Sequence, residues 1–282
     1  MKINLLLKKI KSIPLAYQKH GLDGVIYATL RNLGIKTKYN SIIDKKKDHT
    51  QKKIIHLTKK KIISGYYKST YLNCNTSWSG FDYSSKLLGL YEHQVQEKII
   101  QLQKKYQLEN IVNFGAADGF HIIGLIKNKY FKKGIAFEID KQGQKYLQDN
   151  INMNNLREKI VVSGKADFEK VIDYLNEDEL KKNLFLVDVE GDEFSIFNEN
   201  NLRFFRKSFL IIENHSFLVN DEESKKKFFQ LMKNNFSLEI LQNSGRNPYA
   251  IDEIQDLDDD ERWLMMSEGR AKKMDWIVCV PL

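Results

Sequence analysis

Five short apolar runs, separated by segments of helix length, constrain the fold of this 282-residue chain more than any other feature. They are Ile111–Phe114, Gly134–Glu138, Ile160–Ser163, Leu184–Asp188 and Phe209–Glu213. Strands without polar alternation are buried on both faces, as in a parallel sheet covered by helices on both sides. We expect helices over Gly119–Lys129 and Lys141–Asn154, and a last strand over Trp276–Val280. The pattern predicts an α/β fold with a doubly wound, mostly parallel sheet.

The chain before these runs differs in charge from the rest. Residues 1–72 hold 17 Lys and Arg against three Asp, a net charge of +14, whereas the remainder carries −6. A helix over residues 2–13 would place Ile3, Leu6, Leu7, Ile10 and Ile13 on one face. Such a helix suits a membrane interface or docking on the body of the protein. We therefore predict a basic, mainly helical extension over residues 1–85 and a second domain over residues 86–282.

The basic arm has three interpretations. It could bring the protein to an anionic membrane, contact nucleic acid, or remain a solvated segment. Nucleic acid is less favoured, because no RNA-binding module and no interleaving of aromatic and basic residues is recognisable. No run reaches the ~18–20 apolar residues of a membrane span, and the two cysteines lack any paired-ligand spacing. These features predict a cytoplasmic protein, with peripheral contact at the inner membrane face as an option.

Just before the first strand, apolar residues recur at spacings of three and four. This pattern predicts a single amphipathic helix with one apolar face. The residues concerned are Leu87, Tyr91, Val95, Ile99 and Leu102.

A glycine-containing loop follows the first predicted strand. Gly115 would allow a tight turn and Gly119 a helix start close to a ligand, and Glu138 ends the second strand 23 residues after Gly115. A carboxylate there can accept hydrogen bonds from both hydroxyls of an adenosine ribose. Ala117 stands where a dinucleotide fold prefers glycine, and Asp118 would repel a phosphate. An acidic loop suits the sulfonium and ammonium of S-adenosyl-L-methionine better.

From about residue 86 the chain resembles class I S-adenosylmethionine-dependent methyltransferases, and most of all the FkbM-type family. The strings that carry the resemblance are Val112–His121, Ala136–Asp140, Val187–Glu193 and Ile211–His215. It implies a seven-stranded, Rossmann-like methyltransferase fold, with Asp167 beside the adenine amine. The family usually has an acid at Asn113, so Asp118 or a main-chain carbonyl would take the methionine ammonium here. The predicted cofactor-binding residues are Asn113, Gly115, Ala117, Asp118, Gly119, Glu138, Ile139, Asp167 and Asp188.

Acidic residues and a histidine end the fourth and fifth apolar runs. Asp188, Glu190, Glu213 and His215 should meet in one crevice, because parallel strands end at the same edge of a sheet. Transfer of a methyl group to a hydroxyl requires removal of a proton, so the predicted catalytic residues are Asp188, His215 and Glu190, with His215 or Asp188 as the base. The carboxylates around Asp188 could bind Mg²⁺, which prefers oxygen ligands. We nevertheless predict a site without a metal.

Residues outside the core motifs complete the predicted site. Tyr91 and Glu92 would close it. Arg246 and Arg270 could clamp a phosphate or carboxylate of the acceptor, with Glu213 also in contact with the acceptor. The sequence predicts an O-methyltransferase, and the resemblance implies a sugar, glycan or related small molecule as acceptor. The alternatives are a nucleic-acid methyltransferase that uses the basic arm, and a non-catalytic binding protein on the same fold. The oligomeric state is left open.

Overall fold

The structure, a computed structural model, describes residues 42–75, 82–268, 270 and 272–282, and six single positions between 17 and 29. The chain divides into two compact units, Met1–Lys52 and Lys53–Leu282. Helix α2 (Ile42–Thr58) runs across this division. The predicted helix over residues 2–13 lies outside the described residues. The predicted domain boundary at residue 85 stays a prediction, although Ile62, Tyr67 and Leu72 are fully buried in the core of the second unit.

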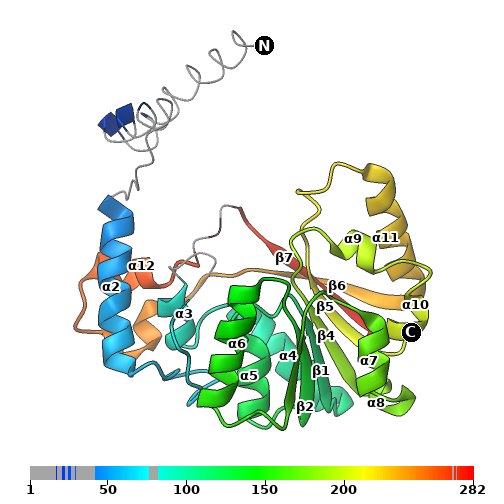
Figure 1. Cartoon of the computed structure of the whole chain (residues 1–282). Coiled ribbons are helices and arrows are strands. Elements are labelled where there is room, and N and C mark those ends of the chain that lie inside the picture. The colour runs from blue at the N-terminus through cyan, green and yellow to red at the C-terminus, as the bar shows by residue number, and fades with distance from the viewer. Residues whose placement is uncertain are drawn as a thin grey trace. The chain divides into compact units, whose positions relative to one another are not determined.

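Seven strands form one sheet within the described part of the second unit (Figure 1). The strand order is β3-β2-β1-β4-β5-β7-β6, with β7 antiparallel to both neighbours and the other pairs parallel. The strands are β1 (Asn110–Phe114), β2 (Lys133–Phe137), β3 (Ile160–Ser163), β4 (Asn183–Val187), β5 (Phe209–Glu213), β6 (Phe236–Gln242) and β7 (Asp275–Pro281). This architecture confirms the predicted fold, and each predicted strand matches an observed one to within one residue at either end.

Helices cover both faces of the sheet (Figure 1). The helices after α2 are α3 (Tyr83–Leu87), α4 (His93–Tyr106), α5 (Phe120–Lys127), α6 (Lys141–Met153), α7 (Phe168–Tyr174), α8 (Glu177–Lys181), α9 (Glu193–Ile196), α10 (Leu202–Phe205), α11 (Glu222–Asn235) and α12 (Asp259–Met265). Short 3₁₀ turns occupy Pro248–Ala250 and Asp252–Ile254.

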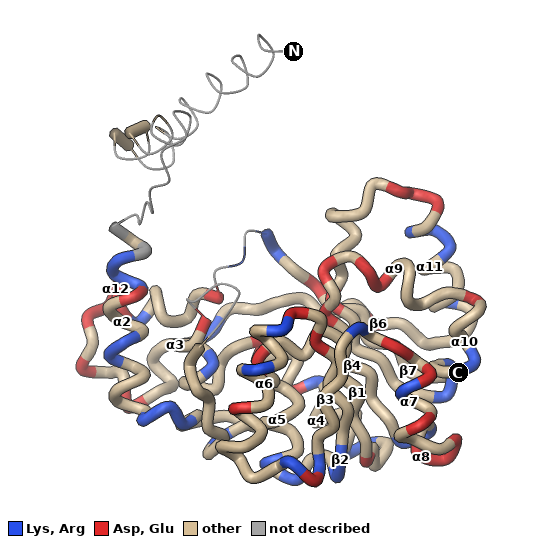
Figure 2. Tube along the Cα trace, in the orientation of Figure 1, with Lys and Arg blue, Asp and Glu red and all other residues tan. Residues whose placement is uncertain are grey.

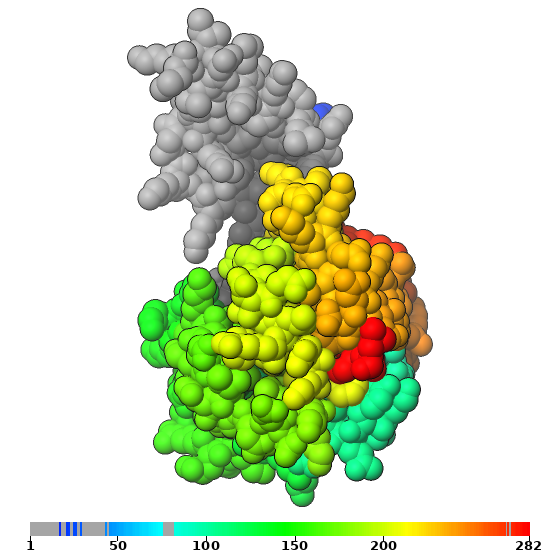
Figure 3. Space-filling view, turned by 90° about the vertical axis from the view of Figure 1, so that its right-hand side faces the viewer, coloured from blue at the N-terminus to red at the C-terminus, as the bar shows by residue number. Residues whose placement is uncertain are grey.

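Two hydrophobic clusters divide the strand residues between them. Leu184 and Leu186 of β4 belong to the cluster with α4, α5 and α6, whereas Phe185 and Val187 belong to the cluster with α7, α10 and α11. Successive side chains of a strand point to opposite faces, so an entirely apolar strand needs a core on each side. Figure 3 shows the segment that includes α11 and β6 beside the C-terminal residues, as the pairing of β6 with β7 requires.

The prediction of one helix from Leu87 to Leu102 is wrong. Helix α3 ends at Leu87 and α4 begins at His93, with Gly89 and Glu92 at positive φ between them. Left-handed residues of this kind terminate a helix. A Cβ on Gly89 would lie 2.1 Å from the carbonyl oxygen of Ser64, so a segment far back in the chain occupies the space of a continuing helix side chain.

Candidate functional site

A cavity of about 550 Å³ opens where β1, β2, β4 and β5 end. Both faces of the sheet are covered, so this edge is where side chains of all four strand ends can reach one space. The predicted residues that line the cavity are Tyr91, Gly115, Ala117, Glu138, Ile139, Asp188, Glu190, Glu213, His215 and Arg270. Asn113, Asp118, Gly119, Asp167 and Arg246 are not among the lining residues.

Glu138 stands at the tip of β2 and is 4% exposed. Its Oε2 accepts a hydrogen bond from the main-chain N–H of Ala117 at 2.8 Å, and its Oε1 accepts one from that of Asp140 at 2.7 Å. Burial raises the pKa of this carboxyl above its usual range, against the effect of the two N–H groups. The next residue, Ile139, is 72% exposed, so it offers the cavity an apolar surface.

The two glycines of the loop are required by protein packing. Gly115 has φ +75, and a Cβ there would lie 1.7 Å from the carbonyl oxygen of Asp188. Gly119 has φ +83, and its Cβ would collide with the side chains of Leu147 and Ile123. A larger residue at either position would therefore push the loop away from β4 or α6, whatever ligand the cavity takes.

Asp118, a residue of this loop, is 2% exposed and ion-paired. Lys86 Nζ lies 3.1 Å from its Oδ2 and 2.9 Å from Oδ2 of Asp82. The ammonium also faces the rings of Tyr83 and Tyr91 at 5.2 and 5.0 Å. Burial disfavours the charge on Lys86, but the two carboxylates outweigh it and raise its pKa. Asp118 is thus committed to Lys86, which lines the cavity in its place.

Asn113 and Asp167 also have structural partners. Asn113 Nδ2 donates to the carbonyl of Leu186 in the neighbouring strand β4, at 3.2 Å. Asp167 is the N-cap of α7, where its Oδ1 accepts from the N–H of Glu169 at 3.0 Å. Both side chains therefore hold elements that border the cavity.

The carboxylates and histidine that end β4 and β5 form one cluster. His215 Nε2 lies 3.3 Å from Glu213 Oε2 and 3.8 Å from Asp188 Oδ1. Burial and the negative charge of Glu213 raise the pKa of Asp188 well above its usual range. Burial opposes a charge on His215, but the facing carboxylates of Glu193 and Glu213 outweigh it and raise the pKa to about 10. The cluster therefore holds positive charge readily.

Glu193 and Glu190 complete this cluster on opposite sides of the imidazole. Glu193 is 1% exposed, and its Oε1 accepts from the N–H of His215 at 2.9 Å while its Oε2 accepts from that of Gly191 at 2.9 Å. Glu190 has a side chain 74% exposed, with Oε2 3.6 Å from His215 Nε2. The acid at position 193 therefore fixes the loop after β4 to the end of β5.

Arg270 and Arg246 already hold protein partners. Arg270 forms ion pairs with Glu92, Glu213 and Glu268, and Arg246 donates to Glu268 and to the carbonyls of Leu90 and Met266. Their guanidinium groups tie the segment before α4 to the segment before β7. Every guanidinium nitrogen of the two arginines already has a protein partner, so neither is placed to clamp an anionic acceptor as predicted.

Several residues of the site were not predicted from the sequence. Lys86 and Asp82 line the cavity at a helical spacing of four, which was a signal for an ion pair. Glu268 and Lys272 lie far from the strand motifs in sequence. Figure 2 shows acidic positions gathered at the edge of the sheet where this cavity lies.

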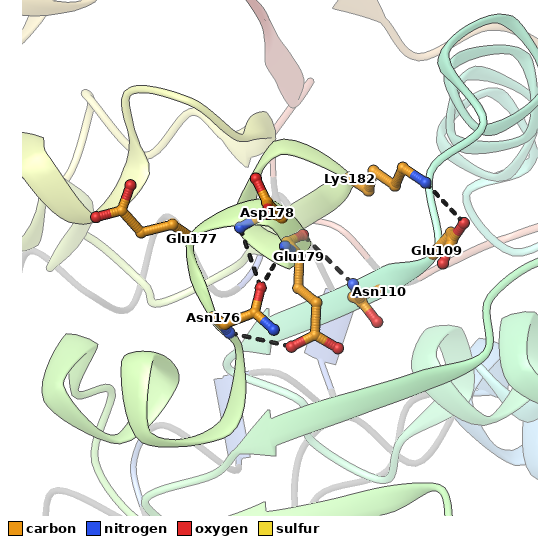
Figure 4. A pocket seen from close by; sticks show the side chains of 7 residues that line it. All are labelled: Glu109, Asn110, Asn176, Glu177, Asp178, Glu179 and Lys182. Carbon is orange, nitrogen blue, oxygen red and sulfur yellow. Dashed lines mark hydrogen bonds and ion pairs between the residues drawn. The ribbon is translucent and has the colours of Figure 1, made fainter.

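A second hollow, of about 410 Å³, lies at the opposite ends of β1 and β4 (Figure 4). Asn176 and Glu179 form a capping box at the start of α8, and Lys182 pairs with Glu109 at 3.1 Å. The polar groups there serve the helix start and an ion pair, so the hollow presents no converging reactive groups.

The chain matches no protein-family model, and no curated protein matches it. Solved structures resemble it in fold. A putative O-methyltransferase from Klebsiella pneumoniae has a TM-score of 0.47 and 11% identity, over 95% of this chain and 100% of that chain. An O-methyltransferase from Bacillus cereus in complex with SAH has a TM-score of 0.45 and 11% identity, over 94% of this chain and 99% of that chain. The M1A22 tRNA methyltransferase TrmK of B. subtilis has a TM-score of 0.44 and 11% identity, over 66% of this chain and 65% of that chain. At these values the function must be argued from the site itself.

Among the helices that the structure describes, none combines the length and the apolar content of a membrane crossing.

Proposed function

We propose that this chain is an S-adenosyl-L-methionine-dependent methyltransferase. The observation that carries the proposal is the position of Glu138, whose buried carboxylate ends β2, faces the cavity and is held against the β1–α5 loop. A carboxylate at this point of a doubly wound sheet suits the paired hydroxyls of an adenosine ribose. Ile139, exposed beside it, offers an apolar surface to the adenine.

The charge of the cavity favours a cationic ligand over a phosphate. Seven Asp and Glu but four Lys and Arg line it. Lys86 and Arg270 among the basic residues are themselves paired with carboxylates. A pyrophosphate would meet Coulomb repulsion here, whereas a sulfonium and an ammonium would be attracted. When bound, S-adenosyl-L-methionine supplies a methyl group on a positively charged sulfur.

We propose O-methylation of a hydroxyl on a sugar, glycan or related small molecule. The enzyme would align the hydroxyl oxygen with the methyl carbon, so that an O–C bond forms while the C–S bond breaks with its electron pair going to sulfur. The hydroxyl proton needs an acceptor at the end of β4 or β5, where Asp188 and His215 line the cavity. His215 could accept it only in its neutral form, which burial favours but the facing carboxylates disfavour by raising the pKa of His215 to about 10. A nucleic-acid acceptor for the basic arm and a purely binding role remain the alternatives.

Calorimetry on the full-length chain tests the cofactor. We expect binding of S-adenosyl-L-methionine and no binding of NAD. Replacement Glu138→Ala should weaken the cofactor by about 1.5–3 kcal/mol for each charge-assisted hydrogen bond lost. Glu158→Ala, a change at an exposed glutamate before β3, is the matched control.

Unchanged cofactor affinity in a folded Glu138→Ala variant would refute the assignment, and so would tighter binding of NAD. The acceptor is tested by transfer of labelled methyl groups to pools of glycans, small sugars and RNA. Labelling of RNA alone would replace the glycan proposal with the nucleic-acid one.

A further inference from the structure

We propose that Asp188, Glu213 and His215 form a binding site for a divalent first-row transition-metal ion. One donor atom of each residue lies within 4.8 Å of the other two. Nε2 of His215 is 3.3 Å from Glu213 Oε2 and 3.8 Å from Asp188 Oδ1. Metal–ligand bonds of ~2.1 Å separate neighbouring donors by ~3.0 Å in octahedral and ~3.4 Å in tetrahedral sites. Both separations from His215 Nε2 therefore lie within ~0.4 Å of the tetrahedral spacing.

An unsatisfied polar atom at the cluster points to a missing ligand. His215 is 2% exposed, and the buried Oδ1 of Asp188 beside it has no hydrogen-bond partner in the described part of the chain. Such an atom is costly without a partner. A cation between Nε2 and the two carboxylates would satisfy Asp188 Oδ1 directly.

The surroundings of the imidazole match those of a metal-binding histidine. The ring nitrogen that does not bind the metal usually faces a carboxylate or carbonyl, which orients the ring. Here Nδ1 faces Glu193 Oε1 at 3.4 Å, and the main-chain N–H of His215 donates to the same oxygen at 2.9 Å. Nε2 is thereby turned toward Asp188 and Glu213.

The donor set favours Mn²⁺ or Zn²⁺ over Mg²⁺. The set combines one imidazole nitrogen with two carboxylate oxygens. First-row transition-metal ions accept both kinds of donor, whereas Mg²⁺ prefers oxygen ligands alone. Arg270 takes the other oxygen of Glu213, Oε1, so Oε2 remains for the ion. The three residues line the cavity, which leaves coordination positions open to a substrate.

The role of the ion rests on the proposed function, although its binding does not. A metal in this position would face the acceptor, and a coordinated hydroxyl loses its proton more readily. His215 would then be a ligand rather than the base. The proton would pass to Glu190, whose Oε2 lies 3.6 Å from Nε2 and whose side chain is 74% exposed to solvent.

Calorimetry with MnCl₂, ZnCl₂ and MgCl₂ on the EDTA-treated, full-length chain tests the site. We expect one Mn²⁺ or Zn²⁺ per chain, with Mg²⁺ weaker. His215→Gln and Asp188→Asn should each lower the affinity by at least ~10-fold. Asp192→Asn, which changes another acid of the cavity wall outside the cluster, should leave the affinity unchanged.

Co²⁺ absorption spectra of the wild-type chain provide a readout that does not depend on the folding of variants. Ligand-field bands of protein-bound Co²⁺ are expected, and they should disappear on addition of excess Zn²⁺. Failure of Mn²⁺ and Zn²⁺ to bind, or equal binding by His215→Gln, would overturn the site and leave His215 as an imidazolium among the carboxylates. Cofactor binding by the metal-free chain is measured separately, so loss of the metal site would not be confused with failure of the proposed function.

Discussion

The carboxylate of Glu138 accepts a hydrogen bond from the main-chain N–H of Ala117 at 2.8 Å, so the end of β2 holds the loop that follows β1. The acid proposed to bind the cofactor therefore also shapes the loop beside it. Burial of this carboxylate disfavours its charge, and the pKa is raised in spite of the N–H donors. The site thus maintains a charged group that the fold by itself would prefer neutral.

The stability contributed by Glu138 should fall as the pH rises. Because the folded-state pKa lies above the unfolded value near 4.5, the folded chain binds this proton more tightly, and its contribution is complete only below that value. We expect the difference in free energy of unfolding between wild type and the non-titrating Glu138→Gln to decrease between about pH 4 and pH 7. Urea denaturation at several pH values measures it. A difference that grows with pH would mean that the N–H groups outweigh burial.

Gly115 should tolerate no side chain. Alanine at this position would combine a strained φ of +75 with a Cβ 1.7 Å from the carbonyl oxygen of Asp188. We expect Gly115→Ala to lower the free energy of unfolding by more than ~2 kcal/mol. The control is Gly245→Ala, where a Cβ meets nothing within 4 Å. Equal stabilities of the two variants would contradict the close packing of the loop against β4.

Loss of Arg270 should destabilise the fold around the cavity. Arg270→Ala would leave the buried carboxylates of Glu92 and Glu213, whose side chains are 2% and 3% exposed, without their guanidinium partner. Breaking a buried ion pair from one side costs about 3–5 kcal/mol. Arg203→Ala is the control, since its pair with Glu169 is exposed and should contribute at most ~1 kcal/mol. Thermal denaturation compares them, and similar midpoints would show that the network contributes little.

The strands and the carboxylates at their ends could be predicted from the sequence, whereas the arginine network could not. An apolar run such as Phe209–Glu213 predicts a strand. Because parallel strands end at the same edge of the sheet, it also predicts where the residues at the end of the strand lie. The anion-binding role predicted for Arg270 had no such support. Its partner Glu92 is 178 positions away, and a guanidinium group in a sequence does not reveal which distant carboxylate it will meet.

The break between α3 and α4 escaped prediction for a related reason. The apolar spacing from Leu87 to Leu102 is helical, but the backbone turns at Gly89 because Ser64 lies against it. Periodicity reports which side of a segment is buried and does not report a contact with another part of the chain.

The acids and histidine at the ends of β4 and β5 should affect turnover more than cofactor binding. Asp188→Asn and His215→Gln remove groups proposed to act on the acceptor, either as base or through a bound ion. We expect turnover to fall at least ~10²-fold while the dissociation constant of S-adenosyl-L-methionine changes less than ~10-fold. Single-turnover kinetics and calorimetry measure the two effects. Full turnover in both variants would place deprotonation elsewhere.

The basic arm is proposed to attach the protein to an anionic membrane surface. Residues 1–72 carry +14, and a helix over residues 2–13 would have an apolar face that a membrane would use and nucleic acid would not. Full-length protein should sediment with anionic vesicles at low salt and be released as the Debye length shortens toward ~8 Å at physiological ionic strength. The triple change Lys8→Glu, Lys9→Glu and Lys11→Glu should abolish sedimentation.

The matched control for the arm is an equal charge change on the surface of α11, made by replacing Lys226, Lys227 and Lys233 with glutamate. These lysines are exposed and lie outside the arm, so the control should still sediment with vesicles. Loss of sedimentation in both variants would mean that the net charge of the protein, and not the arm, determines vesicle binding. The wild-type chain is also tested with RNA under the same low-salt conditions. Binding to RNA but not to vesicles would refute the membrane proposal and favour a nucleic-acid acceptor. RNA binding needs the lysines but not the apolar face.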